Sequence, residues 1–317
     1  MTRRKGTNVT VKSDAQKDIA QHILRYELDM LPKEILRFTT GFCHSVYHVK
    51  TDAGDYVLRI TSEENRAFYL GSIKWLPALA NLDIPAPRVI RHGQYGNVFY
   101  VLMSYICGRD LGEVYATLNN SQKRSITKAL SEIQKKVSTL PSVGVYGYDG
   151  HPFDTWIDFL HSHVERSRGR IERNKVFDAK VCDTVCSAID AMHGYLSSVA
   201  PLPFLDDTTT KNVLVHDGKL AGIVDIDEIC YGDPLFVVAL TNMALLFMKL
   251  DTTYVDFWLD ELDATPAQRR AVKLYTLMFC IDFMGEQGMT FDNGNHVAVN
   301  HEITELLNAI FSTLMDA

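Results

Sequence analysis

Three side chains with oxygen atoms suited to metal binding occur in a fixed order in the second half of the chain: Asp207, Asn212 and Asp225. Between the last two lie the apolar runs Val213–Val215 and Leu220–Ile226, which a short polar segment with an Asp-Gly pair separates. Such a pair between two apolar runs is typical of a β-hairpin turn. The hairpin would bring all three side chains to one end of a small sheet. Because Mg²⁺ prefers carboxylate and amide oxygens, with water and phosphate completing its coordination, the pattern predicts a magnesium site there.

The spacing within this stretch is that of a kinase catalytic loop and its metal-binding aspartate. Asp207 is followed after four residues by Asn212, and a hairpin then leads to Asp225. Protein kinases have a loop base, a loop asparagine and a metal aspartate in the same order. On these residues and on Gly232-Asp233-Pro234, the chain resembles the aminoglycoside phosphotransferase and choline kinase superfamily, which consists of small-molecule kinases with a protein-kinase-like fold. The resemblance runs from about residue 38 to the helix after Pro234.

The stretch departs from the family pattern at three positions. Leu205 and Asp206 stand where the family has His and Gly before the catalytic Asp, and Ile226 stands where it has Trp. The family's His supports the loop and does no chemistry, so its replacement predicts a repacked loop. Asp206 adds a second candidate base, but the spacing to Asn212 favours Asp207.

The resemblance implies a role for each matched residue. Asp207 would accept the proton of a substrate hydroxyl, and Asn212 and Asp225 would hold Mg²⁺ against the phosphates of ATP or GTP. Asp227 would either assist the metal or face solvent, and both alternatives stay open. The implied reaction transfers the γ-phosphate to a hydroxyl of a small, cationic acceptor. An aminoglycoside acceptor would imply antibiotic resistance, and choline-, homoserine- and sugar-like acceptors are alternatives.

The first third of the chain predicts a small antiparallel sheet. The expected strands are 34–39, 46–50, 56–60, 89–92 and 98–104, a usual number for a sheet. A glycine in the first connection could let backbone N–H groups approach phosphates, and an arginine on the third strand could hold them bidentately. The resemblance implies that nucleotide is bound by Gly41, His44, Ser45, Arg59 and, in the segment equivalent to the family's adenine-binding hinge, Met103 and Tyr105.

A helix is expected over 63–79, and it lacks one residue of the family pattern. The family has a glutamate on this helix that pairs with the strand cation. Here Gly71 and Ser72 occupy its expected place, and Glu63 and Glu64 lie earlier. One of these two glutamates could substitute.

The remainder of the chain shows apolar residues at helical spacing. Helices are expected at 14–31, 121–140, 153–171, 180–199, 235–250, 253–261, 266–283 and 301–315, with a loop at 143–150. A β-rich part followed by a helical part predicts the α+β class with segregated lobes. We expect a protein-kinase-like bilobal fold: a small β-rich N-terminal nucleotide-binding lobe with a leading helix, residues 1–104, and a larger, mostly helical C-terminal lobe with the catalytic loop and substrate pocket, residues 105–317.

Composition excludes several other classes of protein. The 317 residues include 46% hydrophobic and 22% charged residues, with a net charge of −7, which is ordinary for a globular enzyme. No general attraction to nucleic acid is expected of an acidic chain. The six cysteines form no CxxC sets, and the polar N-terminus resembles no signal peptide. No apolar run is long enough to span a membrane, so we expect a cytoplasmic protein, whose oligomeric state the sequence leaves open.

Two other functional classes remain to be weighed. A pseudokinase that binds nucleotide without turnover would account for the missing helix glutamate and loop histidine, but the joint retention of Asp207, Asn212 and Asp225 argues against it. The β-rich first third argues against a plain helical interaction protein. Carboxylates that could line a pocket for a cationic acceptor are Asp158, Glu165, Asp282, Glu286 and Asp292, although surface positions are the usual fate of such residues.

Overall fold

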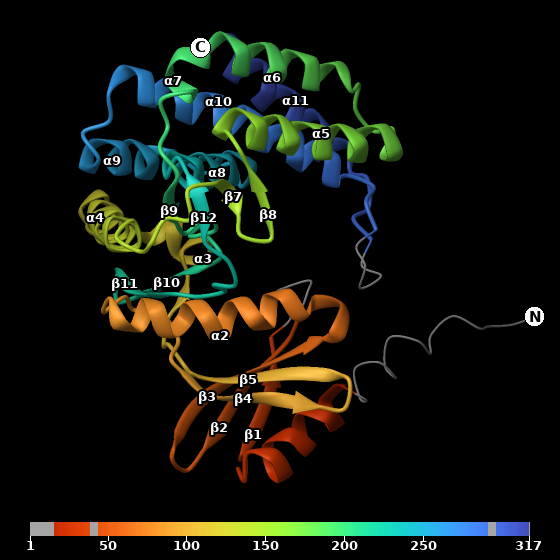
Figure 1. The fold of residues 1–317 in the computed structure, drawn as a ribbon, viewed down its shortest axis with the longest axis vertical. Coiled ribbons are helices and arrows are strands. Elements are labelled where there is room, and N and C mark those ends of the chain that lie inside the picture. The colour runs from red at the N-terminus through yellow and green to blue at the C-terminus, as the bar shows by residue number, and fades with distance from the viewer. Residues whose placement is uncertain (1–15, 39–43, 291–295, 317) are drawn as a thin grey trace, which may run out of the picture. The chain divides into compact units, whose positions relative to one another are not determined.

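The computed structural model describes residues 16–38, 44–290 and 296–316. The chain divides into two compact units, the first formed by residues 1–80 and 87–106 and the second by residues 81–86 and 107–317. Strands dominate the first unit and helices the second (Figure 1). The α+β class with segregated strands and helices, as expected from the sequence, is confirmed.

The first unit contains a five-stranded antiparallel sheet in the order β1-β2-β3-β5-β4. Buried and partly exposed residues alternate along β2, as expected for a strand with one face in the core. Residues 16–22 are helical and continue into η1, whose Ile23 and Leu24 pack with Tyr47 and Leu58 of the sheet. The elements of this unit are η1 (Ile23–Glu27), β1 (Glu34–Arg37), β2 (Ser45–Thr51), β3 (Gly54–Ser62), η2 (Glu63–Asn65), α2 (Arg66–Asn81), β4 (Val89–Tyr95) and β5 (Val98–Ser104).

The second unit is built mainly of helices. Among them α8 is almost wholly apolar and packs against α10, which also contacts α5. The expected helix over 180–199 is two helices, α6 and α7, because the chain turns at Met192. The helices are α3 (Leu111–Val114), η3 (Tyr115–Thr117), α4 (Asn120–Val137), α5 (Trp156–Asn174), α6 (Lys180–Ala191), α7 (His193–Leu196), α8 (Leu235–Phe247), α9 (Thr253–Glu261), α10 (Pro266–Glu286) and α11 (His301–Asp316). Within the described ranges, no helix has the length and apolar character that a membrane span requires.

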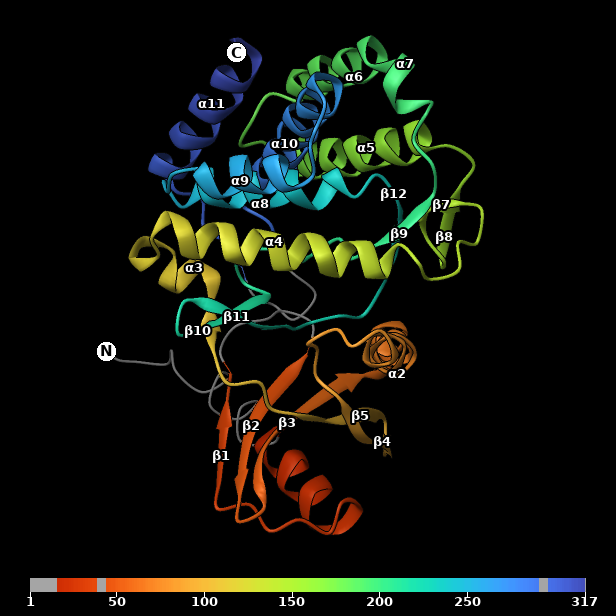
Figure 2. The same ribbon diagram turned by 90° about the vertical axis from the view of Figure 1, so that its left-hand side faces the viewer.

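Two small sheets in the second unit hold the candidate catalytic stretch (Figure 2). The predicted hairpin is confirmed, with Asp217 and Gly218 both at positive φ in its turn. The return strand ends at Ile223, three residues earlier than expected. The strands are β6 (Arg109–Asp110), β7 (Tyr146–Tyr148), β8 (His151–Phe153), β9 (Leu202–Phe204), β10 (Val213–His216), β11 (Lys219–Ile223) and β12 (Cys230–Gly232).

The segment expected as a loop at 143–150 contains a strand. β7 pairs with β8 and with β12, and β12 also pairs with β9. Cys230 of β12 therefore lies between Tyr148 of β7 and Phe204 of β9. Because β9 leads directly into the loop that carries Asp207, this sheet fixes where the loop begins.

Candidate functional site

Asp207 lies on a short loop after β9 whose polar groups are mostly satisfied locally. Thr209 donates a hydrogen bond from Oγ1 to Asp207 Oδ1 at 3.1 Å. The backbone N–H groups of Asn212 and Val213 donate to the Thr209 carbonyl, at 3.2 and 3.1 Å. These bonds close a tight turn, so Asp207 and Asn212 stand at its two ends.

Asn212 joins this loop to the segment that carries Asp225. Its Nδ2 donates to the backbone carbonyl of Asp207 at 2.9 Å, and its own carbonyl accepts from Val224 N at 2.9 Å. The donation from Nδ2 orients the amide and leaves Oδ1 as the atom with ligand capacity. The three residues singled out by their spacing are therefore brought together.

Asp225 has an unusual backbone conformation. Its φ is +59°, in the left-handed region, which few residues other than Gly, Asn and Asp adopt readily. It lies in the irregular segment after β11 and is exposed, while its neighbour Ile226 is buried. Residues in sparsely populated conformations cluster at functional sites, where the surrounding structure holds them.

The carboxylates of this region influence each other's protonation. The side chain of Asp207 reaches solvent, yet the protein around it and the charges of Asp206 and Asp225 raise its pKa to about 7, against the hydrogen bonds from Thr209 and Asn212. Burial, followed by the charges of Asp206 and Asp227, also raises the pKa of Glu228. The segment 206–228 thus concentrates negative charge that a cation would stabilise.

Gln134 of α4 is a contact that the sequence analysis missed. Its Nε2 donates to the Leu205 carbonyl at 2.8 Å and to Thr208 Oγ1 at 3.3 Å, while its Oε1 accepts from Leu205 N at 3.0 Å. Leu205, at the family's His position, is itself buried. The signal in the sequence is a polar residue next to Ile133 and in line with Leu130 and Val137, within the apolar stripe of the helix.

Tyr148 is a second missed contact, since its segment was expected to be a loop. Its hydroxyl donates to Asp206 Oδ2. Burial raises the pKa of Asp206, and this hydrogen bond works in the opposite direction. The second candidate base is therefore tied to β7, whereas Asp207 keeps an exposed side chain.

The sequence-predicted nucleotide residues lie in the first unit, with one exception: Gly41 is outside the described residues. Arg59 occupies the middle of β3 and is buried, opposite Val46 and Val101. His44 Nδ1 lies 3.1 Å from Thr61 Oγ1.

The remaining predicted residues of this unit lie on or beside β2 and β5. Ser45 donates to Gln16 Oε1 at 2.8 Å, Met103 is buried in β5, and the ring of Tyr105 stacks on His48 with centroids 4.2 Å apart. On α2, Ser72 is buried and donates to the Tyr69 carbonyl.

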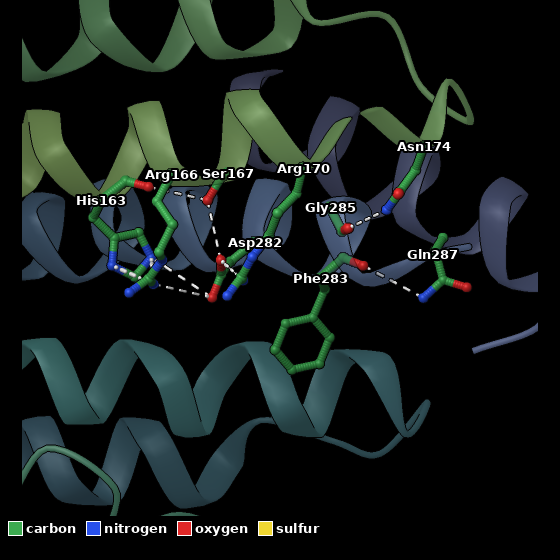
Figure 3. Close-up of polar contacts among 9 residues, drawn as sticks. All are labelled: His163, Arg166, Ser167, Arg170, Asn174, Asp282, Phe283, Gly285 and Gln287. Atoms are coloured by element: carbon green, nitrogen blue, oxygen red, sulfur yellow. Dashed lines mark hydrogen bonds and ion pairs between the residues drawn. The ribbon is translucent and has the colours of Figure 1, made fainter. Parts of the chain in front are cut away.

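Several carboxylates considered for the acceptor are already paired within the chain. Asp282 of α10 accepts from Arg170 at 2.8 Å and from Ser167 at 3.1 Å, and Arg166 lies 3.5 Å from it (Figure 3). Glu165 pairs with an arginine one turn away at 3.1 Å. Asp292 lies outside the described residues. Asp282 therefore has less capacity to bind a cationic acceptor than its charge alone indicates.

The same cluster makes the stability of the protein depend on pH. Burial lowers the pKa of His163 to about 4, although Asp282 works in the opposite direction. Because the unfolded histidine has a pKa of about 6.5, the unfolded state binds an extra proton between these values. The contribution of His163 alone should lower stability by roughly 3 kcal/mol as the pH drops from about 6.5 to 4. The raised pKa of Asp207 contributes in the opposite direction over this range.

Urea unfolding at a series of pH values measures this effect. His163→Gln should remove this loss, so that the variant gains stability relative to the wild type as the pH falls over that range. His161→Gln on the same helix, at a partly exposed position, should keep the wild-type slope. Equal slopes for the His163 variant and the wild type would contradict the assignment.

The donor chemistry of the site fits Mg²⁺. Asn212 offers an amide oxygen and Asp225 a carboxylate, which suit a hard cation that keeps waters and substrate phosphates as further ligands. Among residues 16–38, 44–290 and 296–316, no group of three or more His, Cys, Asp and Glu side chains could hold a metal by itself.

Comparison with known proteins gives a family match. Residues 34–272 match the model of the phosphotransferase enzyme family. A probable ketoamine kinase of Staphylococcus aureus is 27% identical over 222 residues, which cover 67% of this chain and 74% of that protein. Residues 34–272 include the loop of Asp207 and the sheet of the first unit.

Solved structures share the fold at lower identity. Aminoglycoside 2'-phosphotransferase-IIIa in complex with GDP superposes with a TM-score of 0.71 and 17% identity, covering 94% of this chain and 98% of that one. A thermostable mutant of aminoglycoside phosphotransferase APH(4)-Ia, in a ternary complex with AMP-PNP and hygromycin B, gives a TM-score of 0.61 and 16% identity, covering 92% of this chain and 98% of that one. Identities of this size indicate a common fold.

Proposed function

Because the chain belongs to the phosphotransferase enzyme family and is a small-molecule kinase, we propose that it transfers the γ-phosphate of ATP or GTP to a hydroxyl of a small, amine-bearing sugar derivative. The observation that carries this proposal is the joining of Asp207, Asn212 and Asp225 in one hydrogen-bonded segment. The same three residues, scattered, would support no reaction.

Asp207 is the base in this proposal. It accepts the proton of the acceptor hydroxyl as that oxygen attacks the γ-phosphate. Its side chain reaches solvent, while Asp206 is held by Tyr148. This difference supports Asp207 over Asp206 for the role.

Asn212 Oδ1 and the Asp225 carboxylate would hold Mg²⁺, which, when bound, neutralises charge on the nucleotide phosphates. Residues 1–104 form the proposed nucleotide-binding lobe, with Arg59 on the phosphates. Its burial in the middle of a strand supports a fixed guanidinium, which loses little further freedom on binding. His44, Ser45, Met103 and Tyr105, and the Gly41 loop, complete that proposed site.

A ketoamine is the proposed acceptor. The S. aureus relative, a probable ketoamine kinase, is 27% identical to this chain over 222 aligned residues. The negative charge of segment 206–228 is compatible with an amine on the acceptor. The partial neutralisation of Asp282 supports an acceptor with few positive charges.

A thermal-shift titration tests the nucleotide and metal part of the proposal. ATP and GTP, each with and without Mg²⁺, are added to wild type, Asp225→Asn and the control Asp217→Asn at the exposed hairpin turn. Asn tolerates the positive φ of both positions, so both variants should fold. A nucleotide at about a hundred times its Kd should stabilise the wild type and the control by roughly 2.7 kcal/mol, and Asp225→Asn should lose the Mg²⁺-dependent part. Equal Mg²⁺-dependent shifts in all three proteins would exclude Asp225 as a ligand.

A panel of acceptors tests the transfer step. Fructosyl-glycine, kanamycin, hygromycin B and glucose are incubated with MgATP, and ADP release and phosphorylated product are measured. We expect product from fructosyl-glycine. Product from the aminoglycosides alone would replace the ketoamine assignment, and nucleotide binding without any product would favour the pseudokinase alternative.

A further inference from the structure

We infer that Gln134 is a positioning residue of the transfer reaction, which sets the orientation of the catalytic loop from the neighbouring helix α4. This inference rests on the proposed function of the loop. It concerns a residue outside the matched motif, 71 positions before the residue it contacts.

The contact has the geometry of a strand pairing made by a side chain. Gln134 donates to the Leu205 carbonyl at 2.8 Å and accepts from the Leu205 N–H at 3.0 Å. A side-chain amide offers a donor and an acceptor on two separate atoms, which can pair with a carbonyl and an N–H at the same time. Both backbone groups of one residue are thereby satisfied, and the peptide planes on its two sides are fixed.

Burial makes this contact costly to lose. Gln134 is 7% exposed and Leu205 is 2% exposed, so water cannot readily replace the amide. An unsatisfied buried backbone group costs about 1–3 kcal/mol. Without the Gln134 amide, the loop would lower this cost by rotating the peptide groups of Leu205 toward other partners. Such a rotation would displace Asp206 and Asp207, which follow directly in the chain.

Gln134 also contacts the loop on the C-terminal side of Asp207. Its Nε2 donates to Thr208 Oγ1 at 3.3 Å, so the same side chain contacts a residue before Asp206 and a residue after Asp207. The two carboxylates lie between its two attachment points. These two contacts, to Leu205 and to Thr208, give the loop the support that a histidine at position 205 would otherwise supply.

Gln134→Met tests the inference, because it keeps the length of the side chain and removes its hydrogen bonds. Gln134→Glu keeps the acceptor for Leu205 N–H and loses the donor. Thr127→Val is the matched control: Thr127 lies two turns earlier on the same helix, is fully buried, and directs its hydroxyl to the Arg124 carbonyl. Turnover is followed as ADP release from MgATP, with fructosyl-glycine and with water alone as acceptor.

The expected result separates positioning from general stability. A shift of about 1 Å in a reacting group can cost about 100-fold in rate. We expect kcat to fall about 10- to 100-fold in Gln134→Met, and less in Gln134→Glu, while KM for MgATP stays within about twofold. Thr127→Val should retain wild-type kcat at the same temperature below its Tm.

Hydrogen exchange gives a readout that needs no turnover. The backbone amides of residues 204–213 should exchange faster in Gln134→Met than in Thr127→Val. If the wild type shows no kinase activity but the two variants still differ in exchange, the proposed function is wrong, while the role of Gln134 in holding the loop is supported. Wild-type kcat in Gln134→Met, or unchanged exchange, would overturn the inference.

Discussion

Replacing Asp207 with asparagine should reduce kcat about 1000-fold, within the range that general bases contribute, and should leave the protein folded. Asparagine has the same shape and can still accept from Thr209, whose hydroxyl lies 3.1 Å from Oδ1. It cannot take the proton of an attacking hydroxyl. The affinity for MgATP should stay within about twofold, because the proposed nucleotide contacts lie elsewhere.

The stability of this variant gives a second, independent expectation. The carboxylates of Asp206 and Asp225 act electrostatically on Asp207, so removing its charge relieves repulsion among like groups. Without nucleotide or metal, Asp207→Asn should therefore melt at the wild-type temperature or above it. A loss of activity with a raised Tm is difficult to attribute to misfolding.

Two further variants identify the base. Asp217→Asn makes the same chemical change at the exposed turn of the β10–β11 hairpin and should keep full activity. Asp206→Asn should lose less activity than Asp207→Asn. If Asp206→Asn is inactive and Asp207→Asn retains more than about a tenth of the wild-type kcat, the assignment is wrong and Asp206 is the base.

Features that depend on local sequence were predictable here. The hairpin β10–β11 follows from an Asp-Gly pair between apolar runs, and both turn residues have the positive φ that such a turn requires. Helix α9 was expected over the residues it occupies, since its pattern is local. The ordered set Asp207, Asn212 and Asp225 could also be recognised in the sequence, because the segments that connect these residues are short.

Features that depend on distant pairing were not predictable. β7 has three residues, one of them Gly147 at positive φ, and its partner β12 lies about 80 residues later. Neither strand has a periodicity of its own. The contact of Tyr148 with Asp206 depends on this pairing, and the contact of Gln134 with Leu205 joins residues that the sequence places far apart. The order of the candidate residues was therefore visible in the sequence, while the contacts that hold their loop were not.

Gly232 of the Gly-Asp-Pro segment carries the largest expected effect on stability. A Cβ added there would lie 2.3 Å from the six-membered ring of Trp156, which is only 1% exposed. That ring cannot move away easily, because Trp156 Nε1 donates to the Tyr275 hydroxyl at 2.8 Å and Tyr275 in turn donates to Asp233 at 2.9 Å. Gly232→Ala should destabilise the protein by roughly 3 kcal/mol, the upper part of the usual range for overpacking.

Urea unfolding of three variants tests the steric cause. Gly169→Ala makes the same change on α5, where nothing lies within 4 Å of the added atom, and should stabilise the helix by up to about 1 kcal/mol. Trp156→Phe in the Gly232→Ala background removes the colliding ring atoms, so the double variant should lose less stability than the two single losses added together. Strict additivity would mean that the backbone at residue 232, and not Trp156, resists the alanine. β12 pairs with β9 at Gly232, and β9 leads into the proposed catalytic loop, so the same substitution should also lower kcat. If Trp156→Phe restores part of that kcat, the loss of activity comes from the same clash.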